Sequence, residues 1–256
     1  MAIVSLLFHD VYADSPRESG FQSAAADRYK LSVRDFEAQL YGLAGAPLDA
    51  KPFLITVDDG GVSYYTIIAD RLEALGRKGH CFVSTDMIGQ RGFLEAAQIC
   101  ELDRRGHVIG SHSASHPSRF SACSVEQMFD EWSRSRDVLE NLLGHSVGVA
   151  SVPGGYYSRR VAATAREAGL RTLFTSAPAT ATHDEQGIAV MGRFTIRRGH
   201  FPDTARRLVS PAPWARYGAW ASWNAKGVVK PLLGPAYMRV ADWILSEKDP
   251  GPSYVR

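Results

Sequence analysis

The fold of this chain is decided by two short stretches, FLITVDDG at residues 53–60 and VIGSHSASH at residues 108–116. Each begins with an apolar run typical of a buried strand and ends in side chains that can bind a metal ion. Similar apolar runs alternate with helix-like segments between residues 3 and 175. Such alternation favours a parallel α/β arrangement, and the number of units and the chain length favour a barrel over an open sheet.

The two kinds of segment are distinguished by the spacing of their apolar side chains. Phe36, Leu40 and Leu43 fall on one helical face, and Ser32 precedes them as a candidate N-cap. On this basis helices are expected at residues 35–43, 64–75, 95–105, 124–143 and 159–168. Strands are expected at residues 3–8, 53–57, 80–83, 108–109, 147–152 and 172–175.

Composition excludes several classes of protein. The 256 residues are 45% apolar and 22% charged, and 29 basic against 27 acidic residues leave a net charge of only +2. A nucleic-acid-binding protein needs a strong basic excess, and a disordered chain combines low hydrophobicity with high net charge, so neither class fits. No apolar run approaches the roughly 18 residues that span a bilayer.

The cysteines and the first residues bear on the compartment. Three cysteines, Cys81, Cys100 and Cys123, are an odd number without CxxC spacing, so a disulfide framework is not expected. Residues 1–8 are apolar but lack a basic segment and a small-residue cleavage site, and we interpret them as a first buried strand rather than a signal peptide. These features favour a cytoplasmic location.

Two pairs of side chains suggest chemistry. Asp58 and Asp59 follow a predicted strand, and their carboxylates would repel each other there unless a cation lies nearby. An Asp-Asp-Gly triplet on its own is also typical of an ordinary turn. His112 and His116 have the four-residue spacing that places two imidazoles on one helical face, where they can bind one metal ion, although this spacing also arises by chance.

The two pairs together are more specific than either alone. Both follow apolar strands, and the C-terminal strand ends of an α/β barrel form one mouth. One carboxylate and two imidazoles meeting there would make a three-ligand site with open positions, which is typical of a catalytic metal rather than a structural one. The second carboxylate would remain as a proton acceptor.

The segments TVDDG at 56–60 and HSASH at 112–116 resemble the T-F-D-D-G and H-[ST]-x-x-H motifs of the NodB-homology polysaccharide deacetylases, carbohydrate esterase family 4. The resemblance covers roughly residues 3–174 and implies a distorted (β/α) barrel. Residues 8–11 and 29–40 resemble the opening of the branch that acts on exopolysaccharide.

By this resemblance the protein is a metal-dependent hydrolase that removes an N-acetyl group from an amino sugar. The implied metal ligands are Asp59, His112 and His116, and Asp58 is the implied general base. Zn²⁺ is the default ion for two histidines and one carboxylate, and Co²⁺, Ni²⁺ or Fe²⁺ also suit this set.

The later motifs match less well. Residues 151–156, SVPGGY, correspond to the R-x-P-[YFG] motif of the family. A backbone N–H near Gly154–Tyr156 is expected to hold the oxyanion. Ser151 stands where an arginine usually orients the base. Its candidate replacements are Arg193, Arg197 and Arg198. The side chains expected to contact the substrate are Pro153, Gly154, Tyr156, His9 and Arg193.

The general acid has three candidates among the histidines. The family ends this region with an apolar strand and a histidine that protonates the leaving amine. Ile196-Arg197-Arg198-Gly199-His200 is the counterpart here, so His200 is the predicted acid, with His183 and His9 as rivals.

The last part of the chain differs in composition. Residues 190–256 contain eleven Lys and Arg but four Asp and Glu, and they hold four of the five tryptophans. We expect a barrel over residues 1–209 and an extension over 210–256 that packs on it and is not an independent domain. The extension either closes one end of the core or forms a basic, aromatic surface for an anionic membrane or a lipid-linked substrate. Its tryptophans and prolines are Trp214, Trp220, Trp223, Trp243, Pro211, Pro213, Pro231 and Pro235.

The expected substrate is an N-acetylated sugar of a polysaccharide or of its lipid- or nucleotide-linked precursor, because a cytoplasmic enzyme, peripheral to the inner face of the membrane, meets precursors rather than mature wall polymers. Two alternatives remain open. One keeps the metal and the barrel but hydrolyses a small non-sugar amide, as allantoinase-like relatives do. The other is a non-catalytic carbohydrate-binding protein.

Overall fold

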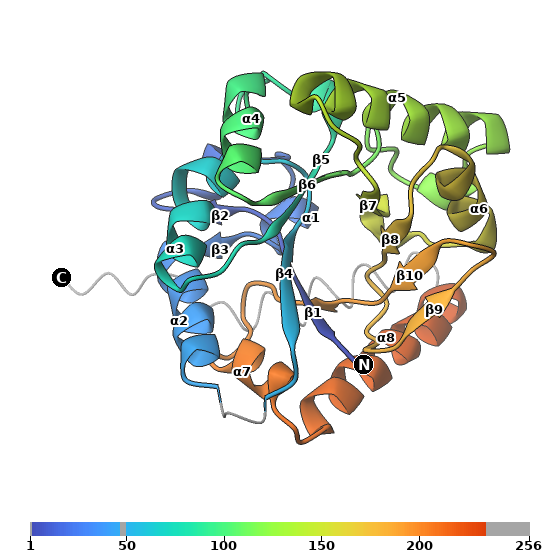
Figure 1. The fold of residues 1–256 in the computed structure, drawn as a ribbon. Coiled ribbons are helices and arrows are strands. Elements are labelled where there is room, and N and C mark those ends of the chain that lie inside the picture. The colour runs from blue at the N-terminus through green and yellow to red at the C-terminus, as the bar shows by residue number, and fades with distance from the viewer. Residues whose placement is uncertain (1, 47–49, 234–256) are drawn as a thin grey trace.

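A computed structural model of the chain describes residues 2–46 and 50–233, and its centre is one curled sheet (Figure 1). The sheet strands are β1 (Val4–Phe8), β4 (Phe53–Val57), β5 (His80–Val83), β6 (Val108–Ser111), β7 (Val149–Ser151), β8 (Thr172–Phe174), β9 (Thr182–Asp184), β10 (Ala189–Met191) and β11 (Phe194–Thr195). Their order is β11-β1-β4-β5-β6-β7-β8-β10-β9. All neighbours run parallel except β9, which is antiparallel to β10.

Helices surround this sheet (Figure 1). They are α1 (Ala24–Asp27), α2 (Val33–Ala44), α3 (Ala69–Ala74), α4 (Ala96–Arg104), α5 (Val125–Leu143), α6 (Arg159–Glu167), α7 (Thr204–Val209) and α8 (Trp214–Leu233). Short helical turns lie at Pro16–Glu18, Thr85–Met87, Phe120–Ala122 and Pro153–Gly155, and two short strands, β2 (Val11–Tyr12) and β3 (Leu31–Ser32), pair with each other. The distorted (β/α) barrel expected from the sequence is confirmed.

The predicted helix starts are also present. The Ser32 hydroxyl accepts a hydrogen bond from the Asp35 N–H at the start of α2. At the start of α5, Ser124 and Gln127 exchange two hydrogen bonds of 2.9 and 3.2 Å, which makes a capping box. The expected helix over 64–75 is present too, but its first turn, Tyr64–Ile68, is a π-helix that leads into α3.

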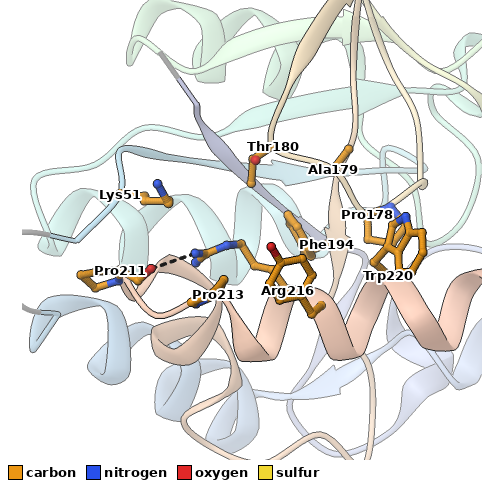
Figure 2. Close-up of a pocket in the computed structure, with 10 residues that line it drawn as sticks. Lys51, Pro178, Ala179, Thr180, Phe194, Pro211, Pro213, Arg216 and Trp220 are labelled. Atoms are coloured by element: carbon orange, nitrogen blue, oxygen red, sulfur yellow. Dashed lines mark hydrogen bonds between the residues drawn. The ribbon is translucent and has the colours of Figure 1, made fainter.

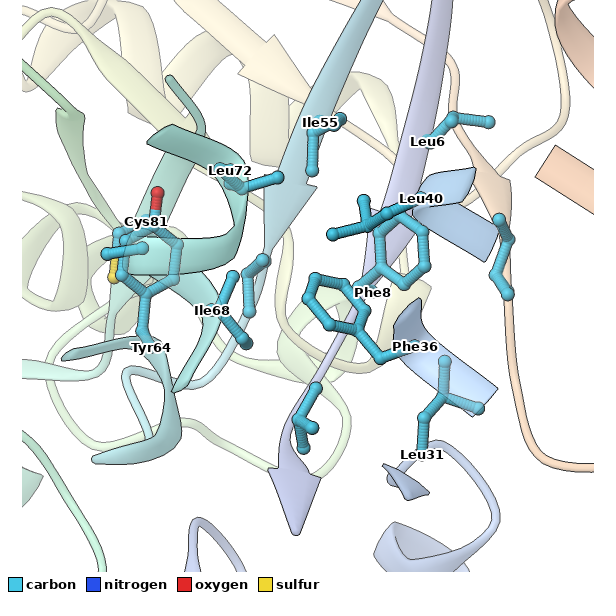
Figure 3. Packing of buried hydrophobic residues seen from close by; sticks show 14 of the residues in the cluster. Leu6, Phe8, Leu31, Phe36, Leu40, Ile55, Tyr64, Ile68, Leu72 and Cys81 are labelled. Carbon is cyan, nitrogen blue, oxygen red and sulfur yellow. The ribbon is translucent and has the colours of Figure 1, made fainter. Parts of the chain in front are cut away.

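The main apolar core lies between the sheet and its outer helices (Figure 3). Phe8 of β1 and Phe36 of α2 meet edge to face, with ring centroids 5.4 Å apart and an interplanar angle of 89°. Leu40 of α2 and Ile55 of β4 belong to the same buried cluster. Burying each such side chain contributes about 1.5–3 kcal/mol, so the strands that carry the acids have a rigid support behind them.

The barrel closes through β10 and β11, which follow each other in the chain. β10 pairs with β8 near one end of the sheet, and β11 pairs with β1 at the other. Only Gly192 and Arg193 separate the two strands. A side chain at position 192 would collide with the carbonyl oxygen of Ala177, so glycine is required where the chain changes partner.

The C-terminal third contains elements that the sequence did not predict. β9, β10 and β11 have only two or three residues each, too few for a hydrophobic period to be recognised. In the predicted extension, α8 packs Ala215 and Ala219 against the main core. Trp243 and Pro235 lie outside the described residues. Within residues 2–46 and 50–233, no helix combines the length and the apolar character needed to cross a membrane.

Candidate functional site

The acid pair and the histidine pair meet at one end of the barrel. Asp58 and Asp59 follow β4 and His112 follows β6, so the carboxyl ends of strands in one parallel sheet bring them together. Asp59 Oδ1 lies 3.4 Å from His112 Nε2 and 3.6 Å from His116 Nε2. One ligand atom from each of these three residues lies within 4.8 Å of the others. We call Asp59, His112 and His116 the ligand group.

The backbone that carries the two histidines differs from the predicted one. The four-residue spacing predicted a helical face, and that prediction was wrong, because residues 112–116 form a loop. Ser113 and His116 have φ of 63° and 56°, and Asp59 has φ of 77°. Non-glycine residues in this left-handed region cost about 1–3 kcal/mol each and are concentrated at functional sites. Here they turn both segments sharply enough for the ligand atoms to converge.

Two contacts hold the histidine loop in place. His112 Nδ1 donates to the carbonyl oxygen of Ser151 at 2.9 Å, which orients the imidazole ring so that Nε2 faces Asp59. The carboxylate of Glu131, on α5, accepts hydrogen bonds from the N–H and the hydroxyl of Ser115 at 2.8 and 2.6 Å. Glu131 could not be predicted from the sequence, because one acid inside an amphipathic helix belongs to no motif.

Asp58 is not part of the ligand group and is held by Arg193. Arg193 Nη1 and Nη2 donate to Asp58 Oδ1 and Oδ2 at 2.7 and 2.8 Å, and both side chains are buried. Burial alone would raise the pKa of Asp58, but the Arg193 guanidinium lowers it, so the carboxylate stays ionised. Ser151 donates to Asp58 Oδ2 at 3.0 Å and accepts from Arg193 Nη2 at 2.6 Å. The arginine missing at position 151 is thus supplied from between β10 and β11, whereas Arg198 lies over the ring of Tyr12.

The charges of the site favour a cation. Burial opposes the ionisation of Asp59, but the hydrogen bond from His112 and the neighbouring histidines hold its pKa well below the usual value. Burial likewise opposes a charge on His112, while Asp58 and Asp59 together raise its pKa. Burial, aided by His112, lowers the pKa of His116, so that its imidazole is neutral. One carboxylate oxygen and two imidazole nitrogens are a donor set that fits Zn²⁺ and other first-row divalent ions.

The third motif forms a tight loop after β7. Pro153 is buried, and Gly154 and Gly155 have φ of 60° and 71°, which only glycine adopts without strain. Tyr156 is 40% exposed at the end of this turn. The loop starts two residues after Ser151, which contacts both Asp58 and His112, so its backbone lies beside the site.

The three candidate acids lie in different places. The ring of His9 contacts the ring of Tyr29 at a tilt of 40°, with centroids 4.8 Å apart. His9 is also close enough to both aspartates for their charges to oppose the lowering of its pKa by burial. His200 lines a cleft together with Tyr29 and Arg193. His183 is exposed on the edge strand β9. The structure thus brings His9 and His200, but not His183, towards the mouth of the barrel.

A further buried acid, Asp10, lies near the site and was not predicted from the sequence. Asp10 Oδ1 accepts hydrogen bonds from the hydroxyls of Ser19 and Ser63 at 2.6 and 2.9 Å, and within the described residues Oδ2 is buried without a partner. Burial, together with the charge of Asp59, raises the pKa of Asp10 to about 6. Only the folded structure reveals this group, because its two serines are 9 and 53 residues away.

Comparison with known proteins identifies the family. The sequence profile of the polysaccharide deacetylase family matches residues 45–173, about half of the chain, which includes the ligand group and Asp58. The chain belongs to the polysaccharide deacetylase family. It is also 27% identical over 155 residues to YxkH of Bacillus subtilis (strain 168), which bears the name of a polysaccharide deacetylase; this match covers 59% of the chain and 55% of that relative.

Solved structures share the fold. The deacetylase PplD of Streptococcus pyogenes, solved in complex with acetate, superimposes with a TM-score of 0.69 at 19% identity, over 82% of this chain and 99% of that one. IcaB of Ammonifex degensii superimposes with a TM-score of 0.64 at 22% identity, over 86% and 97% of the two chains. At this level of identity the likeness concerns the fold, and the expected NodB-type architecture is thereby confirmed.

Proposed function

We propose that this protein is a metal-dependent deacetylase that removes an N-acetyl group from an amino sugar of a polysaccharide or of its precursor. The observation that carries the proposal is the convergence of Asp59, His112 and His116 beside Asp58, which remains outside the ligand group. A divalent ion held by these three residues would supply Lewis acidity, which polarises an acetyl carbonyl and lowers the pKa of a water molecule.

The side chains of the protein handle the proton. Asp58, kept ionised by Arg193, accepts a proton from the attacking water. Arg193 and Ser151 together fix both carboxylate oxygens, so the base cannot rotate out of position. A backbone N–H near Gly154–Tyr156 stabilises the developing oxyanion, and a histidine then protonates the amine that leaves as a free amino sugar. For this last role we propose His200, with His9 as the alternative that the geometry also allows.

The geometry supports catalysis over a purely binding role. The chain retains every side chain of the ligand group and an ionised base, and Arg193 fills the position that Ser151 leaves open. A non-catalytic relative, or an amidase that acts on small non-sugar amides, was considered because Ser151 stands where the family usually has an arginine. With Arg193 against Asp58, that reason no longer applies.

The test combines metal binding with acetate release. We expect Asp59→Asn and His112→Ala to lose Zn²⁺ binding and activity together, and Asp58→Asn to keep Zn²⁺ while losing turnover. His145→Ala is the matched control, because His145 is exposed and paired with Asp103 away from the site. Acetate release should stop when a chelator is added and return with Zn²⁺. Normal turnover by the Asp58 variant would show that the proposed base is wrong.

We further propose that the substrate is a lipid- or nucleotide-linked precursor, met at the cytoplasmic face of the membrane. Support comes from exposed aromatic side chains on α8 and in the loop before α7: Trp214, Tyr217, Trp220 and Phe201, of which Trp214 and Tyr217 are in ring contact. Arg206 and Arg207 line one hollow with Trp214, and they share one acidic partner, Asp203. We expect binding to phosphatidylglycerol vesicles at low salt and not to phosphatidylcholine vesicles. A protein that sediments with neither contradicts this part of the proposal.

A further inference from the structure

A narrow cleft of about 150 Å³ lies beside the site, between β11, the loop that follows β8, and α8. It is lined by aromatic and polar side chains, among them Tyr29, Ser176, Arg197, His200 and Trp223. Trp223 is 41% exposed and Tyr29 is 36% exposed, so both rings offer a face to a ligand. No acidic side chain is among the described residues that line the cleft.

Three contacts connect this cleft to the catalytic machinery. Arg193, which lines it, is the residue that holds Asp58. The ring of Tyr29 contacts the ring of His9, with centroids 4.8 Å apart. At the opposite wall, Trp223 Cη2 lies 3.6 Å from the position a Cβ would take at Gly155, in the loop after β7. A molecule in the cleft would therefore lie immediately beside a sugar whose acetyl group is at the ligand group.

The lining has the chemistry of a carbohydrate site. The C–H face of a pyranose ring packs on an aromatic ring, and its hydroxyls need donors and acceptors at the rim. Trp223 and Tyr29 supply the aromatic faces, and Ser176 and Arg197 supply polar groups. Trp223 is supplied by α8, which lies outside the matched residues 45–173, so the family profile assigns it no role.

A larger hollow, which shares Pro178 with the cleft, is less suited to bind the substrate. It measures about 480 Å³ and lies against α8, with Lys51, Arg216 and Trp220 around it (Figure 2). Arg216 already donates to the carbonyl oxygens of Leu208, Ser210 and Pro211. None of the residues that line this hollow belongs to the ligand group or contacts Asp58.

We propose that the smaller cleft binds the sugar unit next to the one that is deacetylated, with Trp223 as its stacking platform. This inference rests on the proposed function and deepens it, because it assigns the enzyme a substrate of at least two linked sugars. Trp223 is a residue that determines substrate length: a single N-acetylated sugar at the ligand group does not reach it, whereas the second unit of an oligomer does.

The test is binding of N-acetylglucosamine oligomers of one, two and four units to the Zn²⁺-loaded protein, measured by calorimetry. Losing one aromatic stacking contact corresponds to a weakening of about three- to tenfold. We expect Trp223→Ala to weaken binding of the two- and four-unit oligomers by this factor and to leave the single sugar unchanged. Trp223→Phe, which retains a ring, should restore most of the affinity. Tyr41→Ala, at an exposed aromatic side chain on α2 in a different hollow, is the matched control.

The outcomes separate this inference from the proposed function. The role of Trp223 is overturned by any of three results: the wild type and Trp223→Ala bind the oligomers equally, the variant loses as much affinity for the single sugar as for the oligomers, or the wild type binds no oligomer. Acetate release is measured separately on the same proteins. If Trp223→Ala binds the oligomers as the wild type does and both proteins release acetate, only the proposed role of the cleft is contradicted. If Trp223→Ala loses the length-dependent binding but the wild type releases no acetate, only the proposed reaction is contradicted.

Discussion

Replacing Arg193 with methionine tests whether this arginine holds the base. The change removes the cation that donates to Asp58 at 2.7 and 2.8 Å, in a place where neither side chain is more than 4% exposed. Breaking a buried ion pair by removing one partner costs about 3–5 kcal/mol. In a chain of this size 1 kcal/mol lowers the melting temperature by about 2–4 °C, so we expect a decrease of roughly 6–20 °C.

A double-mutant cycle isolates the interaction. Asp58→Asn alone should also destabilise the protein by several kcal/mol, because it leaves the Arg193 guanidinium buried without a countercharge. The double variant buries neither charge and should lose less than the sum of the two single changes, with a coupling of at least about 2 kcal/mol. It does not return to wild-type stability, because Arg193 also donates to the Thr175 carbonyl and to the Thr56 hydroxyl at 3.1 and 3.2 Å.

The free energies of unfolding should be measured by urea titration in the presence of a chelator, so that no metal compensates Asp58. The pair Arg71–Glu37 is the control, because its atoms lie 2.9 Å apart but its side chains are 32% and 41% exposed. The cycle on that pair should give a coupling below about 1 kcal/mol. If the coupling between Arg193 and Asp58 is as small as that of the surface pair, Arg193 does not compensate the base and the reasoning is refuted.

Two other predictions concern residues that the sequence did not reveal. Asp10 has its pKa raised to about 6 by burial, so its contribution to stability is present below its unfolded value of 3.8 and is lost as the pH rises through 6. The free energy of unfolding of Asp10→Asn, relative to that of the wild type, should therefore increase by up to about 3 kcal/mol between pH 4 and pH 8 in urea titrations. A difference in unfolding free energy that stays constant with pH would contradict the raised pKa. Glu131→Ala removes the carboxylate that holds Ser115, and Zn²⁺ affinity in a chelator competition should fall by about 10–100-fold, with the helical circular dichroism unchanged. An affinity within twofold of the wild type would show that the histidine loop needs no such support.

The parts of the site that could be predicted are those that neighbouring residues specify. The run at 53–57 is apolar and ends in two acids, so both the strand and its functional end are visible in eight letters of sequence. The helix caps at Ser32 and Ser124 are local for the same reason. The parallel arrangement then places the ends of β4 and β6 at the same mouth, and the ligand group follows from that topology.

The parts that could not be predicted depend on contacts between distant residues. Arg193 is 135 residues away from Asp58 and 42 from Ser151, and three arginines in that region were equally plausible. The helical reading of the residues 112–116 failed because spacing alone does not reveal left-handed backbone angles. Ser111 and Glu131 accept hydrogen bonds from backbone N–H groups of this loop. Such contacts produce no periodic pattern of residues that could be recognised in the sequence.

Closure of the barrel and orientation of the base depend on the same two residues. Gly192 lets the chain pass the Ala177 carbonyl, to which the Arg193 N–H then donates at 3.0 Å, while the Arg193 guanidinium crosses to Asp58. A chain whose sheet has not closed at β10 and β11 therefore lacks an oriented base, whereas the ligand group needs only the part of the sheet from β4 to β7. Asp58 requires a guanidinium that reaches it from inside the barrel. Arg193, between β10 and β11, supplies this group as well as an arginine at position 151, at the end of β7, would. This explains why serine is tolerated at position 151, where its hydroxyl connects the arginine to the carboxylate.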